Sequence, residues 1–238
     1  MSKRYPLILL VLFVVIAGVL AIGPYDRKDW MLENALGLGA VVVLVATYRR
    51  FPLSNVSYTV LFVFLALHEL GAHWTYSKVP YDEWFTALTG RGLNERFGFE
   101  RNHYDRMIHF LYGLLIAYPI RELVVRVADV RGFWGYFFPL DIIMSTSMLY
   151  ELIEWGASIV FGGDLGQAYL GTQGDEWDAQ KDMLLATAGA VLALAITALI
   201  HRALHRDFHR EWVASLKVKR KQPLGEVEVA RLRKRTSS

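Results

Sequence analysis

The chain has 238 residues, of which 54% are hydrophobic and 21% are charged, with a net charge of +3 and no cysteine. The lack of cysteine excludes disulfide bonds and thiolate metal sites. The small positive charge does not indicate a nucleic-acid partner, because domains that bind nucleic acids usually carry a strongly basic face.

Six segments are apolar enough to cross a bilayer, which takes about 20 residues per helix. They cover residues 5–22, 31–48, 56–74, 105–121, 134–153 and 183–200. The first begins after Lys3 and Arg4, as a signal peptide does, but Pro24 directly follows its small residues. Proline is a poor residue after a cleavage site, so we expect a retained helix. The pattern predicts an all-α, polytopic membrane helix bundle with about six transmembrane helices, forming one domain over residues 1–200.

The loops between these segments differ in charge. With six spans, one side of the membrane receives the Lys- and Arg-rich loops, and this side is normally the cytoplasm. We therefore expect both termini in the cytoplasm and a multi-pass protein of the bacterial inner membrane, in contact with membrane lipids. The basic positions are Lys3, Arg4, Arg49, Arg50, Arg121, Arg126, Arg131, Arg202, Arg206, Arg210 and the run at 217–221.

Two segments outside the spans have helical patterns. The loop 75–104 predicts a short interfacial helix broken at Gly90 and Gly92. Residues 201–238 form a basic cytoplasmic tail, which we expect to begin as an amphipathic helix and to end disordered at 222–238. Such a helix attracts anionic lipid of the inner leaflet. Its apolar stripe is Leu204, Phe208, Trp212 and Leu216. Three histidines also recur every four residues, at His201, His205 and His209. This spacing could form a metal-binding face, but a solvated basic helix is the favoured interpretation.

Ionisable residues gather at the outer ends of four predicted spans, where such groups are costly and usually functional. Residues three or four apart share a helix face, so each end can direct two or three of these side chains inward. In HELGAH at 68–73, Glu69 and His73 share a face and His68 is turned about 100° away, so the string is not a zincin motif. The complete set is Glu69, His73, Asp105, His109, Glu151, Glu154, Asp175, Asp178 and Asp182.

Carboxylates combined with imidazoles suit zinc, iron or manganese. We predict Glu69, His73, Asp105, His109 and Asp182 as metal ligands, and Glu151, Glu154 and Asp178 as acid/base groups. The corresponding function is a metal-dependent enzyme acting on lipid or cell-envelope precursors. One alternative is a structural or accessory protein, in which Arg101 or Arg106 neutralises the carboxylates to lock the helices. Another is an ion or metal transporter, with Asp141 on the path. The sequence does not indicate an oligomeric state.

The strings HELGAH, RNHYDRMIHF, YELIEW and GTQGDEWDAQKDM, in this order and spacing, resemble the YjdF-type family of uncharacterised bacterial inner-membrane proteins. The resemblance covers about residues 30–200 and implies a membrane protein, without implying an activity.

The chain is also similar to VanZ-like membrane proteins, whose pattern includes D-[KR]-x-x-H-F, a later Glu-bearing helix and D-x-x-x-N-x-x-G. Asp105-Arg106 with His109-Phe110 fits the first part and Glu154 the second, while Asp182 stands where the third expects Asn. VanZ-like proteins are associated with glycopeptide resistance and envelope phenotypes, so this similarity implies a role facing the envelope.

Overall fold

The computed structural model describes residues 4–161, 163, 172–204, 207–219 and 221–236, and these contain helices and no strand. The all-α prediction is confirmed. The long helices are α1 (Arg4–Leu20), α2 (Arg27–Thr47), α3 (Asn55–His73), α6 (Tyr104–Ala128), α7 (Trp134–Phe161) and α9 (Asp178–Leu204). The short ones are α4 (Tyr81–Thr89), α5 (Leu93–Phe97), α10 (Phe208–Ser215) and α11 (Leu224–Thr236).

Within these residues, four helices are long and apolar enough to cross a membrane, namely α2, α3, α6 and α9. Helix α1 is equally apolar but has only 17 residues. Helix α7 has 28 residues and includes Asp141, Glu151 and Glu154. A polytopic membrane bundle is therefore present, while the predicted number of six spans stays a prediction.

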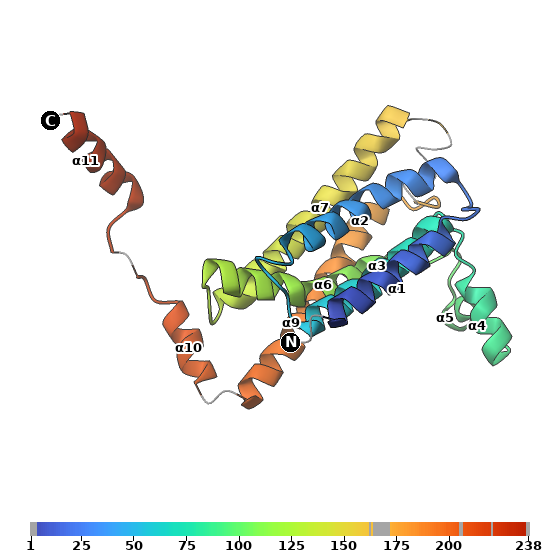
Figure 1. The fold of residues 1–238 in the computed structure, drawn as a ribbon, viewed down its shortest axis with the longest axis horizontal. Helices are drawn as coiled ribbons and strands as arrows, with labels where there is room; N and C mark the ends of the chain where they lie inside the picture. Colours follow the sequence, from blue (N-terminus) through green and yellow to red (C-terminus); the bar gives the residue numbers. More distant parts are fainter. Residues whose placement is uncertain (1–3, 162, 164–171, 205–206, 220, 237–238) are drawn as a thin grey trace.

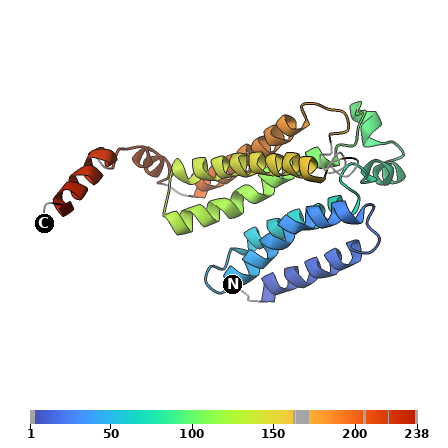
Figure 2. The ribbon, with the colours of Figure 1, turned by 90° about the horizontal axis from the view of Figure 1, so that it is seen from above.

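The long helices form two groups, which lie one above the other in Figure 2. Helix α3 packs against α1 and α2, whereas α6 packs against α7 and α9. Contact between α3 and α6 joins the groups. Helices α4 and α5 lie at one end of the bundle, and the N-terminus of α1 lies at the end from which α10 and α11 extend (Figures 1 and 2).

Local sequence signals explain where several helices begin and end. Asp26 caps α2 by accepting hydrogen bonds from the backbone N–H groups of Lys28 and Asp29, and Ser54 caps α3. Such side chains satisfy backbone donors that have no partner within the helix. Gly90 ends α4 in a left-handed conformation that a glycine adopts without strain. The loop 75–104 thus contains two short helices separated where the sequence predicts a break.

The closest helix pair is α6 with α9, which cross at two glycines. A Cβ atom on Gly113 would lie 1.8 Å from the backbone oxygen of Ala186, and one on Gly189 would lie 2.1 Å from that of Phe110. Both distances are far below van der Waals contact. The two backbones therefore lie too close together for any residue with a Cβ atom at these positions. Small residues allow this kind of packing between membrane helices. The crossing fixes the N-terminal ends of α6 and α9 relative to one another.

At the opposite end of α6, Glu122 ties this helix to the start of α3. Its carboxylate accepts hydrogen bonds from the backbone N–H of Ser54 (2.9 and 3.0 Å) and from the Ser57 hydroxyl (2.5 Å). Arg126, one turn along α6, donates to the same carboxylate at 2.7 Å. These bonds fix the contact between α3 and α6 that joins the two helix groups.

The tail differs from the sequence prediction in two respects. Phe208 and Trp212, half of the expected lipid-facing stripe, instead pack with Tyr136 against the core formed by α6, α7 and α9. Residues 224–236 form helix α11, apart from the bundle (Figure 1), where the sequence predicts disorder. The charged pattern of this segment has no apolar face to bury, which explains the disorder prediction. Of the expected histidine face, His205 lies outside the described residues, and His201 Nδ1 accepts a hydrogen bond from Tyr136 at 2.9 Å.

Candidate functional site

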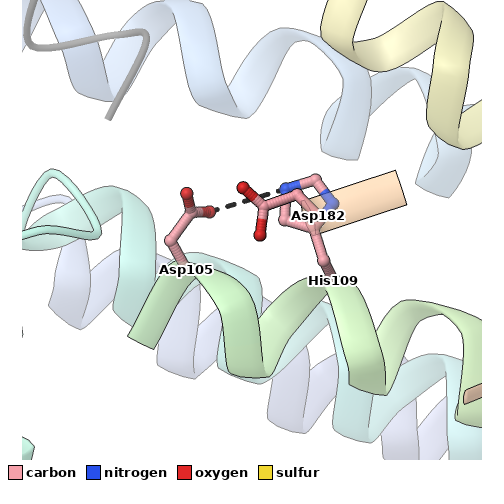
Figure 3. Close-up of side chains that lie close together, drawn as sticks. All are labelled: Asp105, His109 and Asp182. Carbon is pink, nitrogen blue, oxygen red and sulfur yellow. Dashed lines mark ion pairs between the residues drawn. The ribbon is translucent and has the colours of Figure 1, made fainter. Parts of the chain in front are cut away.

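Three of the predicted ligands meet at the end of the bundle where α6 and α9 begin. Asp105 and His109 stand one turn apart on α6, and Asp182 approaches from the first turns of α9 (Figure 3). One ligand atom from each side chain lies within 4.8 Å of the others. Among the described residues, this is the group of His and carboxylate side chains whose geometry can hold a metal ion. We call Asp105, His109 and Asp182 the central triad.

Glu151 of α7 adjoins the central triad. His109 Nε2 lies 3.6 Å from Asp105 Oδ1 and 3.7 Å from Glu151 Oε1. These separations are too long for hydrogen bonds. Two ligand atoms that each lie about 2 Å from a tetrahedral metal ion are roughly 3.4 Å apart. The separations of His109 from Asp105 and from Glu151 are therefore within a few tenths of an ångström of the spacing in a metal site.

The site is buried, and some of its polar atoms lack hydrogen-bond partners among the described residues. Asp182 is 2% exposed and His109 7%. Within the described part of the chain, Asp182 Oδ1 and Glu151 Oε1 are buried and have no hydrogen-bond partner. A buried carboxylate oxygen without a partner costs free energy, so such groups are normally paired or coordinate a metal. This observation is independent of the clustering and favours the binding of a cation or a proton at these oxygens.

Two further carboxylates surround the triad. Glu154 of α7 is buried and lies close enough to Asp105, Glu151 and Glu33 to interact with each electrostatically. Glu33 of α2 is 5% exposed and accepts a hydrogen bond from the Tyr150 hydroxyl at 3.0 Å. Sequence reasoning missed Glu33 and its buried neighbour Asp29. A signal was present, because the two stand four residues apart at the start of the second apolar segment.

His68 faces this region from α3. Its Nε2 lies 3.2 Å from the backbone oxygen of Glu33, and its Nδ1 is hydrogen-bonded to the Tyr76 hydroxyl. Because a carbonyl only accepts, Nε2 donates the hydrogen of its bond to Glu33. The imidazole is thus held between α2 and the segment after α3.

Glu69 and His73 lie on the other face of α3 and do not join the central triad. His73 Nδ1 donates to the backbone oxygen of Leu20 at 2.7 Å, and the backbone oxygen of His73 accepts from Tyr25 N–H at 2.8 Å. These bonds fasten the loop between α1 and α2 to the end of α3. Glu69 is 4% exposed, and its Oε2 has no hydrogen-bond partner among the described residues. Because His68 is offset by about 100° from Glu69 along the helix, His68 faces the centre in place of the predicted ligands Glu69 and His73.

Asp178 takes part in an ion-pair network beside the triad. Arg101 donates to both of its carboxylate oxygens at 2.6 and 3.2 Å, and Arg106 donates to Oδ1 at 3.1 Å. Arg106 also pairs with Asp175, which accepts a further hydrogen bond from Lys181 at 2.6 Å. We call Arg101, Arg106, Asp175 and Asp178 the arginine clamp. It joins the start of α6 to the start of α9, so Asp178 holds the two helices together next to the site.

The clamp determines the charge state of groups outside the spans. Hydrogen bonds from Lys181, from the Trp177 backbone and from Arg106 hold the pKa of Asp175 well below its usual value. Desolvation, together with the nearby positive charges of Arg106 and Arg101, lowers the pKa of His103. Both groups therefore keep their neutral-pH charge states, with Asp175 ionised and His103 uncharged.

Asp141, the predicted marker of a path across the membrane, is exposed on the surface of α7 and apart from the triad. Residues 164–171, which include the start of the GTQGDEWDAQKDM string, lie outside the described residues.

Comparison with known proteins agrees with this architecture. The family model described as "Predicted membrane protein (DUF2238)" matches residues 5–203. The chain belongs to this family. It is 36% identical, over 193 residues, to the inner membrane protein YjdF of Escherichia coli (strain K12), a match that covers 81% of this chain and 87% of the relative. No solved structure matches the chain. The predicted family and the membrane location are confirmed, and every residue of the triad and the clamp falls within the matched region.

Proposed function

We propose that this protein is a membrane-embedded, divalent-metal-dependent enzyme of the bacterial inner membrane, acting on lipid or cell-envelope precursors at the outer face. The observation that carries the proposal is the central triad, with unpartnered carboxylate oxygens on Asp182 and on the adjacent Glu151. Asp105, His109 and Asp182 are the proposed ligands of zinc, iron or manganese. Glu69 and His73 are left out of this ligand set because His73 is bonded to Leu20.

A divalent ion in this site would supply an activated water or a polarised oxygen. Glu151, 3.7 Å from His109, is placed to move a proton at the same point, and Glu154 adjoins it. Asp178 is assigned a positioning role, since both arginines of the clamp bind it. The Tyr150 hydroxyl holds Glu33 at the edge of the site.

The proposal includes six spans with both termini in the cytoplasm. Six long helices, and the position of the N-terminus at the end of the bundle that also bears α10, support this topology (Figure 2). The triad then faces the outer leaflet. The lysines around α10 and beyond are proposed to contact anionic lipid at the inner leaflet.

One observation favours a second function, that of an accessory protein whose polar residues only lock helices together. The arginine clamp is such a lock, because it pairs buried charges of α6 and α9 across the same end of the bundle. In that case the carboxylates of the triad are protonated and bind no ion.

Metal content of the purified full-length protein distinguishes the two functions. After gentle extraction without chelator, we expect stoichiometric zinc, iron or manganese by mass spectrometry, lost in Asp182→Asn and in His109→Gln. Glu95→Gln is the matched control, since Glu95 is an exposed carboxylate in α5. A well-folded wild-type protein without metal, which also fails to take up added ions, would overturn the enzyme proposal in favour of the lock.

A further inference from the structure

A cavity of about 320 Å³ opens beside the central triad, within the range of small-ligand pockets. Four helices line it, namely α2, α3, α6 and α7. Its walls are mostly apolar and include Leu36, Phe64, Ile108, Leu149 and Ile153. A cavity with such walls favours an apolar occupant over water.

The two ends of the cavity differ in chemistry. One end reaches His68, Asp105, His109 and Tyr150, the side chains at and around the triad. The other end extends along the spans to Phe64, where the hydroxyls of Tyr112 and Thr146 bond to each other at 2.6 Å. In that bond each hydroxyl is the partner of the other, so neither is available to bind an occupant of the cavity. The cavity therefore suits an amphiphile with a polar head and a hydrocarbon chain.

The cavity is open between two of the helices that line it. Helices α2 and α7 belong to different helix groups (Figure 2) and are not among the closely packed helix pairs. The bond between Tyr150 and Glu33 bridges them at the polar end. Leu36 on α2 and Leu149 on α7 line the cavity and yet are 49% and 54% exposed. Since this is a membrane protein, the molecules at such an apolar opening are lipids.

Charge complementarity identifies the head group. The polar end holds the triad, and Glu33, Glu151 and Glu154 lie next to the triad. These three glutamates are not among the proposed metal ligands, so negative charge remains beside a bound ion. The guanidinium groups of Arg101 and Arg106 are paired with Asp175 and Asp178, which leaves the other carboxylates of this end without an arginine in direct contact among the described residues. A cationic head group is therefore favoured over an anionic one.

We propose that this cavity binds one acyl chain of an amine-headed membrane phospholipid, with the ammonium group held at the carboxylates beside the triad. The inference rests on the proposed function, because this lipid is then the substrate presented to the metal centre. It extends that proposal from lipids in general to phospholipids that carry a primary amine.

Photocrosslinking tests the inference on the full-length protein. The protein is reconstituted in vesicles of phosphatidylethanolamine and phosphatidylglycerol, with one of the two carrying a diazirine on an acyl chain. We expect crosslinks at Phe64, Leu149 and Ile153 from the phosphatidylethanolamine probe, at least tenfold above those from the phosphatidylglycerol probe. Ala40→Phe, which fills the cavity from α2, should reduce them by a similar factor.

Ala35→Phe is the matched control, because Ala35 is an exposed alanine of the same helix that does not line the cavity. It should crosslink as the wild type does. Equal labelling by the two probes would overturn the choice of head group, and labelling unchanged by Ala40→Phe would overturn the binding of a chain in the cavity. Metal content, measured on the same samples, reports on the proposed function separately, since neither alanine touches the triad.

Discussion

At the scale of single residues, Asp178 shows how one side chain serves both structure and site. It is 3% exposed and pairs with two arginines, while Asp182 one turn later has an oxygen without a partner among the described residues. The two carboxylates share a helix face, but of the two only Asp178 pairs with Arg101 and Arg106. Sequence spacing predicts that both point inward, but it does not contain the pairing that gives Asp178 a structural role in place of the predicted acid/base role.

Replacing Asp178 with alanine should strongly destabilise the protein. Removing one partner of a buried ion pair leaves the other charges desolvated, which costs about 3–5 kcal/mol. We expect a loss of this order in the free energy of unfolding, measured in detergent. Glu95→Ala is the control, because its pair with Arg91 is more than half exposed and contributes about 0.5 kcal/mol or less. Equal effects of the two substitutions would contradict a structural role for the clamp.

The clamp should also make stability depend on pH in the acid range. Hydrogen bonds in the folded state lower the pKa of Asp175 below its ordinary value of 3.8. Because the folded state lowers this pKa, ionised Asp175 stabilises the folded protein fully above pH 3.8. This stabilisation is lost as the pH falls through the lower pKa of the folded state. The difference in melting temperature between wild type and Asp175→Asn should be constant well above pH 3.8 and should shrink below it. A difference that grows on acidification would contradict this sign.

At the scale of helices, the site depends on how closely α6 and α9 approach. Asp105 and His109 come from one helix and Asp182 from the other, and the glycine crossing lies just below them. The triad can therefore be disturbed without touching any of its members.

Adding a single methyl group at the crossing tests this dependence. Gly113→Ala would place a Cβ against the backbone of α9, and overpacking of this kind costs about 1–3 kcal/mol. We expect a lower melting temperature and weaker retention of metal than in wild type. Gly39→Ala on α2 is the control, since a Cβ there meets nothing within 4 Å. A Gly113→Ala protein that is as stable as this control would show that the helices separate at no cost.

Much of this architecture can be predicted from local patterns, because apolar length indicates helices and paired charges indicate shared faces. The break at Gly90, the offset of His68 and the shared face of Asp105 and His109 all follow from spacing along a helix. What spacing does not contain is the rotation of each helix against its neighbours. That rotation directs His73 to Leu20, brings His68 and Glu33 to the centre, and turns Phe208 and Trp212 onto Tyr136.

At the scale of the whole molecule, the predicted topology places α4 and α5 outside and the tail inside. The chain has no cysteine, so a single introduced thiol reports its own side of the membrane. We expect Glu83→Cys in intact cells to react with a membrane-impermeant maleimide, and Lys219→Cys to react only after permeabilisation. Both positions are exposed, so burial does not interfere. Labelling of Lys219→Cys in intact cells would refute the six-span topology.

The order of the helices along the chain also affects how the protein is made. Asp178 lies 77 residues beyond Arg101, so synthesis at about 5–20 residues per second leaves about 4–15 seconds between them. During that interval the ribosome has delivered α6, with Asp105, Arg106 and His109, but not the helix that neutralises and encloses them. The outer end of α6 is therefore expected to wait at the water interface, and the arrival of α9 completes both the clamp and the triad in one step of biogenesis.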